Sequence, residues 1–155
     1  KFDGKHVAEH YCQLAASPVQ GEAANYRGNI KQYLEPLLRQ HQEVEFVLFV
    51  PPLSVANFAL NNQTEKFMVF REALYAATDG FQNARVLDFV ADHELIGNLQ
   101  LYKDVEHYSL GVSNDMLEAM GRDHSLYVVS HDVKVLNDQF LLFVEAWKGG
   151  NHLCD

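Results

Sequence analysis

The sequence has no apolar run long enough to cross a membrane, and it has few basic residues. Apolar runs such as Phe46–Val50 extend over five residues, whereas a membrane-spanning helix needs roughly 18–20. Lys and Arg together number 12 against 21 Asp and Glu, so the formal net charge is −9. A surface of this sign repels phosphate backbones. We therefore expect neither a membrane span nor a nucleic-acid partner.

Cysteine is scarce, and the two cysteines lie near opposite ends of the chain, at Cys12 and Cys154. They are too far apart in sequence to form a metal-binding knuckle. Two interpretations stay open: two unrelated thiols, or a disulfide that joins the ends of an exported protein. No signal peptide is visible and the sequence begins with Lys1. We therefore expect any targeting segment to lie upstream.

Two segments are typical of buried strands, and a helical segment lies between them. The strands are predicted at Val44–Val50 and Ala84–Val90, and the helix at Thr64–Thr78 with Thr64 as its N-cap. This alternation predicts an α/β fold, a three-layer α/β/α arrangement with a flavodoxin-like parallel sheet in which the two strands are neighbours. A complete domain of that type has more strands, so residues 1–155 are expected to be one partial domain.

Helical periodicity recurs along the rest of the chain. A helix over Tyr26–Leu38 should be kinked or divided by Pro36. Other helices are predicted at His6–Leu14, at Val112–Met120 before Gly121, and at Val133–Trp147 between a Ser130 cap and Gly149–Gly150. The stripe Phe140, Phe143 and Trp147 indicates core packing rather than a carbohydrate platform.

The best candidate for chemistry is the pair Asp104 and His107, three residues apart before the helix at Val112. An Asp at this spacing can place its carboxylate beside the imidazole, fix the ring tautomer and stabilise the imidazolium. We therefore expect the carboxylate within about 2.6–3.2 Å of a ring nitrogen. The alternative is structural, with Asp104 capping the turn and His107 a surface histidine.

Three stretches of the sequence resemble SGNH/GDSL-type hydrolases. They are Phe46–Ser54 (FVLFVPPLS), Val86–Phe89 (VLDF) and Asn98–Ser109 (NLQLYKDVEHYS). In that family an Asp-x-x-His pair supplies the acid and base of a catalytic triad, so the resemblance gives these roles to Asp104 and His107. Relatives in architecture modify bacterial surface polymers by O-acetylation or D-alanylation. The resemblance thus implies an acylated surface saccharide as substrate, no cofactor, and a periplasmic or cell-surface location, anchored through an upstream segment.

The nucleophile of that family is missing from this sequence. No Gly-Asp-Ser-like turn is present, so we expect the chain to be the C-terminal portion of an esterase or acyltransferase and to be inactive alone. Ser54 is interpreted as a loop hydroxyl after the double proline, and it is the local alternative nucleophile to test, because it follows the carboxyl end of a predicted strand. A second hypothesis remains: a non-catalytic binding domain on a hydrolase-like scaffold.

Other candidates favour structural roles. His6 and His10 have the spacing that lets two imidazoles face one cation on a helix. No third ligand stands at a recognisable spacing, so we expect exposed histidines and no metal. Asp88, near the end of the second strand, is interpreted as a turn acceptor rather than a second catalytic acid.

Overall fold

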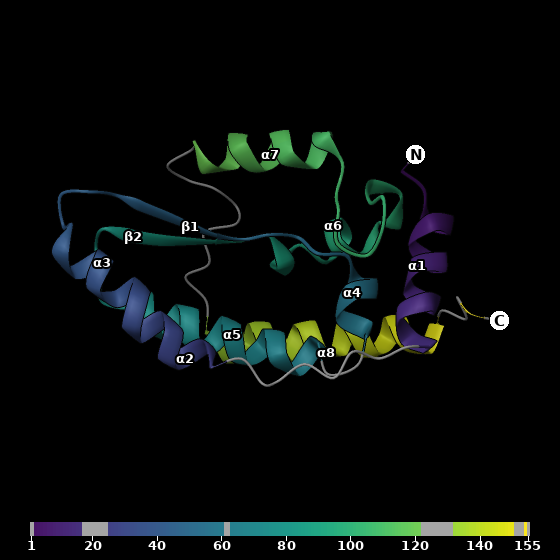
Figure 1. The fold of residues 1–155 in the computed structure, drawn as a ribbon, viewed down its shortest axis with the longest axis horizontal. Helices are drawn as coiled ribbons and strands as arrows, with labels where there is room; N and C mark the ends of the chain where they lie inside the picture. The colour runs from purple at the N-terminus through teal and green to yellow at the C-terminus, as the bar shows by residue number, and fades with distance from the viewer. Residues whose placement is uncertain (1, 17–24, 61–62, 122–131, 151–153, 155) are drawn as a thin grey trace.

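The computed structural model describes residues 2–16, 25–60, 63–121, 132–150 and 154, and 68% of this part is helical (Figure 1). The strands are β1 (Phe46–Val50) and β2 (Ala84–Asp88). The helices are α1 (Gly4–Ala16), α2 (Tyr26–Asn29), η1 (Ile30–Leu34), α3 (Glu35–Gln40), α4 (Val55–Ala59), α5 (Gln63–Thr78), η2 (Phe89–Ala91), α6 (His93–Gly97), η3 (Leu99–Leu101), α7 (Leu110–Met120) and α8 (Val133–Gly150).

The expected three-layer, flavodoxin-like fold is wrong, because the described residues form only two parallel strands within a mostly helical structure. The physical reason lies in the segments around the strands. The stretch after β1 contains helix α4, and β2 gives way after Asp88 to the 3-10 turn η2. Apolar residues at helical spacing are far more frequent in this chain than runs that suit a strand.

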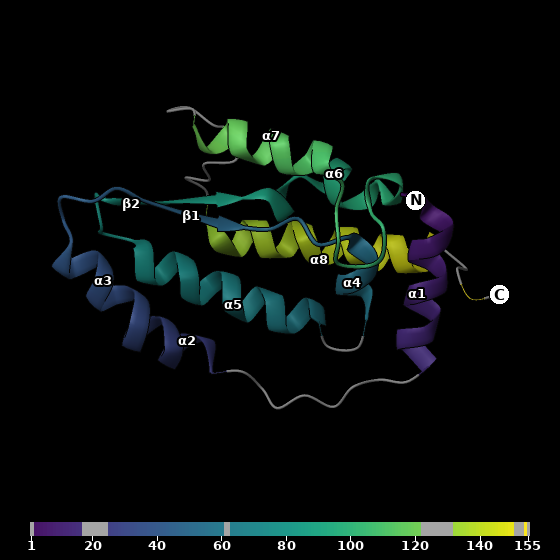
Figure 2. The ribbon, with the colours of Figure 1, turned by 45° about the horizontal axis from the view of Figure 1, so that its top comes forward.

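The two strands pair in parallel as predicted, with Phe46 opposite Ala84 and Val50 opposite Asp88. Alternate side chains point to opposite faces of the pair. Leu48 and Val86 pack into a core with residues of α5 and α8, whereas Leu87 packs with residues of α7. Figure 2 shows α7 on one side of the strands and α5 with α8 on the other. β2 is therefore buried on both faces at Val86 and Leu87, whereas β1 is partly open to solvent, with Phe49 47% exposed.

Proline divides the helical segment over Tyr26–Leu38, as the sequence predicts. A π-helical stretch, η1, separates α2 from α3, and Pro36 lies in the first turn of α3. Proline has no backbone N–H and cannot continue the ladder of a preceding helix, but it is tolerated in a first turn. The π-helical stretch η1 ends just before α3, so Pro36 falls in a first turn, where a missing backbone N–H removes no helical hydrogen bond.

One helix end differs from prediction. Thr64 lies inside α5 rather than before it, and its hydroxyl donates to the Phe58 carbonyl at 2.7 Å because α4 brings that carbonyl within reach. Helix α8 ends at Gly150, within the predicted Gly149–Gly150 stop. The expected Ser130 cap lies outside the described residues.

A buried ion pair joins the core elements. Arg71 of α5 and Asp88 of β2 are both fully buried, with Nε 2.8 Å from Oδ2, and Arg71 Nη2 donates to Oδ1 at 3.3 Å. Arg71 Nη1 also donates to the Leu136 carbonyl and to Asn137 Oδ1 of α8, each at 3.4 Å. The guanidinium lies over Phe140, 5.3 Å from the ring centroid. This one side chain therefore links α5, β2 and α8.

The two ends of the chain meet. Helix α1 lies across one end of the molecule, where the C-terminus also lies (Figures 1 and 2). Cys12 of α1 forms a disulfide with Cys154, across a sequence separation of 142. The structure therefore confirms the disulfide and excludes two unrelated thiols. No helix in the described ranges is long and apolar enough to span a membrane.

Candidate functional site

The candidate pair lies on a tightly closed loop, residues 102–108, which we call the Asp104 loop. Tyr102 and Tyr108 form an antiparallel bridge at its base. Lys103 N–H donates to the His107 carbonyl at 2.8 Å, and Ser109 N–H donates to the Leu101 carbonyl at 2.8 Å. These backbone hydrogen bonds close the loop without any contribution from its side chains.

Asp104 and His107 contact each other directly. His107 Nδ1 lies 2.9 Å from Asp104 Oδ1 and 2.8 Å from Oδ2, so the predicted distance is confirmed. Asp104 Oδ1 also accepts the backbone N–H groups of Glu106 and His107, each at 2.9 Å. With Nδ1 donating to the carboxylate, Nε2 is the ring nitrogen able to accept a proton. The His107 side chain is 72% exposed, so external groups can reach it.

The surroundings of Asp104 favour its charged form. Burial acts to raise the pKa of this carboxyl, but the hydrogen bonds from the Glu106 and His107 backbone N–H groups and from the His107 ring outweigh it, and the pKa is lowered. The ionised Asp104 carboxylate accepts hydrogen bonds from all three of these groups.

This lowered pKa predicts how the loop responds to acid. A carboxyl group whose pKa is lowered by folding stabilises the fold above its unfolded pKa, near 4, and loses that contribution as the pH falls through its folded pKa. The Asp104 loop should therefore stay intact at pH 5–7 and loosen only below about pH 4. NMR of the Glu106 and His107 amide protons across this range measures it. Loosening between pH 5 and 6 would contradict the assigned hydrogen bonds.

Ser54 holds the Asp104 loop rather than acting as a nucleophile. Its side chain is fully buried, its hydroxyl donates to the Val105 carbonyl at 2.8 Å, and its backbone N–H donates to the same carbonyl at 3.2 Å. Its Oγ also accepts from Asn57 N–H at 3.4 Å and caps α4. A substrate cannot reach this hydroxyl, so the hypothesis that Ser54 is the nucleophile is wrong.

Further contacts attach the loop to the carboxyl end of β1. The Tyr102 hydroxyl donates to the Pro52 carbonyl at 2.7 Å, and Tyr102 is fully buried. Asn57 Nδ2 lies 3.4 Å from Glu106 Oε1. The segment after β1 and the pair therefore lie at the same end of the strands. Tyr102 and Asn57 were not predicted from sequence, although Asn57, a polar residue five positions after Pro52 in an apolar segment, is a usable signal.

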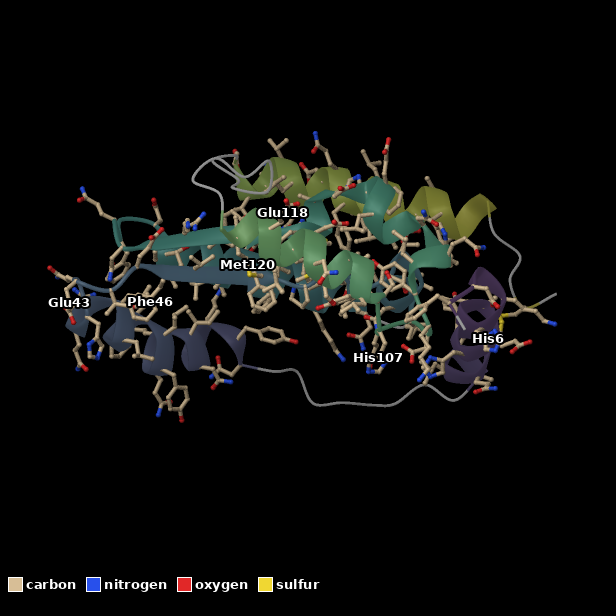
Figure 3. All side chains as sticks on the ribbon, turned by 90° about the horizontal axis from the view of Figure 1, so that it is seen from above. His6, Glu43, Phe46, His107, Glu118 and Met120 are labelled. Atoms are coloured by element: carbon tan, nitrogen blue, oxygen red, sulfur yellow. A yellow bond between two sulfur atoms is a disulfide. The ribbon has the colours of Figure 1, made fainter. Side chains whose placement is uncertain are left out.

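The chain contains a second Asp-x-x-His pair with almost the same geometry. Asp3 Oδ1 accepts the His6 backbone N–H at 3.0 Å and lies 2.8 Å from His6 Nδ1. In Figure 3, His6 and His107 both lie towards the end of the molecule that α1 covers. An Asp that binds the backbone N–H three residues later brings that residue's side chain close in both places. The two pairs differ in one respect: Asp3 approaches His6 Nδ1 through Oδ1, whereas Asp104 presents both carboxylate oxygens to His107 Nδ1.

The remaining candidates take structural positions. His10 Nδ1 lies 3.5 Å from Val105 N–H, and no group of three or more His, Cys, Asp and Glu side chains able to hold a metal occurs among the described residues. Asp88 accepts the Val90 N–H at 3.1 Å, as expected for a turn acceptor. Its pairing with Arg71 was not predicted.

A depression of about 780 Å³ lies away from the pair, beside Arg39, Glu43 and Phe81 at the amino ends of the strands. Figure 3 shows Glu43 and His107 far apart along the molecule. The pair therefore does not line this depression.

The comparisons with known proteins supply no relative: no family model, no curated protein and no solved structure matches the chain.

Proposed function

We propose that Asp104 and His107 are the acid–base pair of a serine acyl-transfer enzyme, and that this chain is the C-terminal portion of an SGNH-like esterase or acyltransferase. One observation supports this most strongly: both carboxylate oxygens of Asp104 lie within 2.9 Å of His107 Nδ1, while the ring is mostly exposed. That arrangement holds one tautomer and leaves Nε2 accessible.

In the proposed reaction, a serine outside these 155 residues is the nucleophile. His107 Nε2 takes the proton from the serine hydroxyl as its oxygen attacks an ester carbonyl carbon. The same proton passes to the alcohol that leaves, and an acyl-serine remains. Water or a sugar hydroxyl then gives its proton to Nε2 and takes the acyl group, after which the proton returns to the serine. Asp104 stabilises the imidazolium in both steps.

The substrate we propose is an acylated cell-surface polysaccharide, and the location is the periplasm or cell surface. The sequence resemblance supports the substrate. The Cys12–Cys154 disulfide supports the location, because disulfides persist mainly in oxidising compartments. The exposure of His107 suits a polymer, which cannot enter a closed pocket.

A non-catalytic interaction domain is the second candidate. The Asp3–His6 pair favours it, because it has the same contact as Asp104–His107 and no role in the proposed chemistry. The burial of Ser54 favours it too, since this leaves the segment after β1 without an accessible serine.

Comparing this chain with a longer polypeptide that includes its upstream sequence tests the proposal. The chain alone should give no saturable hydrolysis of p-nitrophenyl acetate, because its sequence has no Gly-Asp-Ser-like turn to supply the nucleophile. The longer polypeptide should hydrolyse the ester and be inactivated by a fluorophosphonate that labels one serine. A longer polypeptide that is inert and unlabelled would favour the interaction domain. Saturable turnover by the chain alone, abolished in His107→Ala, would show that it contains its own nucleophile.

A further inference from the structure

Val105 lies between Asp104 and His107 in sequence, and it contacts residues of two helices, α1 and α4. Its carbonyl accepts both donors of Ser54 at the start of α4, and its N–H lies 3.5 Å from His10 Nδ1 of α1. Its side chain is fully buried in one small cluster with Val7 of α1 and Ala56 of α4. Val105 directly follows Asp104, so the position of the carboxylate depends on this anchorage.

Helix α1 has little else to hold it in place. Val7 is its only buried residue, and its main packing partners in the described part of the chain are α4 and η3. Tyr11 adds an edge contact to Trp147 of α8, with ring centroids 5.9 Å apart. The covalent attachment is the bond between Cys12 and Cys154. Figure 2 shows α1 crossing the end of the molecule, away from the long helices for most of its length.

We propose that α1 is the positioning element of the Asp104–His107 pair and that the Cys12–Cys154 disulfide keeps it in place, so that reduction loosens the Asp104 loop. A dithiol supplies the two electrons: its two sulfurs join in a disulfide, and Cys12 and Cys154 become thiols. The reduced chain then retains α1 through the Val7 cluster, the His10 contact with Val105 and the Tyr11 contact, without a covalent bond to Cys154. An effect of reduction on catalysis rests on the proposed function. The loosening of the Asp104 loop is expected whether or not that function is right.

Hydrogen exchange on the whole chain, oxidised and dithiol-treated, tests this. Amides of residues 99–108 should exchange roughly tenfold faster after reduction, whereas those of α5 and β2 should be unchanged, because the Arg71–Asp88 core does not involve α1. A Cys12→Ser/Cys154→Ser variant should exchange fast in this loop and ignore the dithiol. Val7→Ala in the oxidised chain should loosen the same loop without touching the disulfide.

The pKa of Asp104 gives a second readout. It should not change on reduction if the disulfide only stabilises the fold and does not position the Asp104 loop. Carboxyl-carbon NMR should show the Asp104 pKa rising towards its ordinary value on reduction, as its three donors are lost. Equal exchange and an equal pKa in both redox states would overturn the proposal, and so would equal acceleration of α5 and β2. A longer polypeptide that is inert towards esters while its Asp104 loop still responds to the dithiol would refute only the proposed function.

Discussion

Replacing Arg71 with methionine is expected to lower the free energy of unfolding by about 3–5 kcal/mol, because it leaves a buried carboxylate without its partner. Asp88 is fully buried, and Arg71 approaches it with Nε at 2.8 Å and Nη2 at 3.3 Å. The same substitution removes the donor to the Leu136 carbonyl. Since whole domains are stable by only about 5–15 kcal/mol, a loss of this size should be plain in urea unfolding.

A matched surface pair separates burial from charge. Arg27 and Glu72 also form an ion pair, at 3.4 Å, but their side chains are 73% and 43% exposed. Arg27→Met should therefore cost less than about 1 kcal/mol. Adding Asp88→Asn to Arg71→Met should recover part of the loss, because the unpaired charge is removed. Equal effects of Arg71→Met and Arg27→Met would show that the buried pair does not organise this core.

Replacing His107 with alanine in the longer, active polypeptide is expected to lower kcat/KM by roughly 10²–10⁴-fold, the usual contribution of a general base. Asp104→Asn should also lower the rate, since the amide cannot stabilise an imidazolium as a carboxylate does. His6→Ala is the matched control: it removes a histidine with the same Asp contact and leaves the rate unchanged. Similar rates for His6→Ala and His107→Ala would assign both pairs to capping.

Local features of this structure were predictable from sequence. The parallel pairing of the strands follows from their apolar character and from the helix between them, and the Asp104–His107 contact follows from the three-residue spacing. The division of the helix at Pro36 follows from a missing N–H. The contact and the helix division depend on neighbouring residues in sequence, whereas the strand pairing, which joins distant residues, follows from the length of the connecting helix.

Long-range features were not predictable in the same way. Arg71 is a polar residue within a helical pattern, and nothing in its neighbours indicates that Asp88, 17 positions later, meets it in the core. Ser54 follows a strand, as a nucleophile would, yet its hydroxyl is turned to the Val105 carbonyl 51 positions away. The three-layer fold was predicted by analogy with larger sheets, but this chain forms only two strands in its described part.

The rate at which a fluorophosphonate labels the serine of the longer polypeptide tests the central claim most directly, because labelling needs an activated hydroxyl and no knowledge of the natural substrate. The account predicts that His107→Ala slows this labelling by roughly 10²–10⁴-fold, whereas His6→Ala leaves it unchanged. Labelling at the wild-type rate in His107→Ala would contradict the claim that His107 is the base.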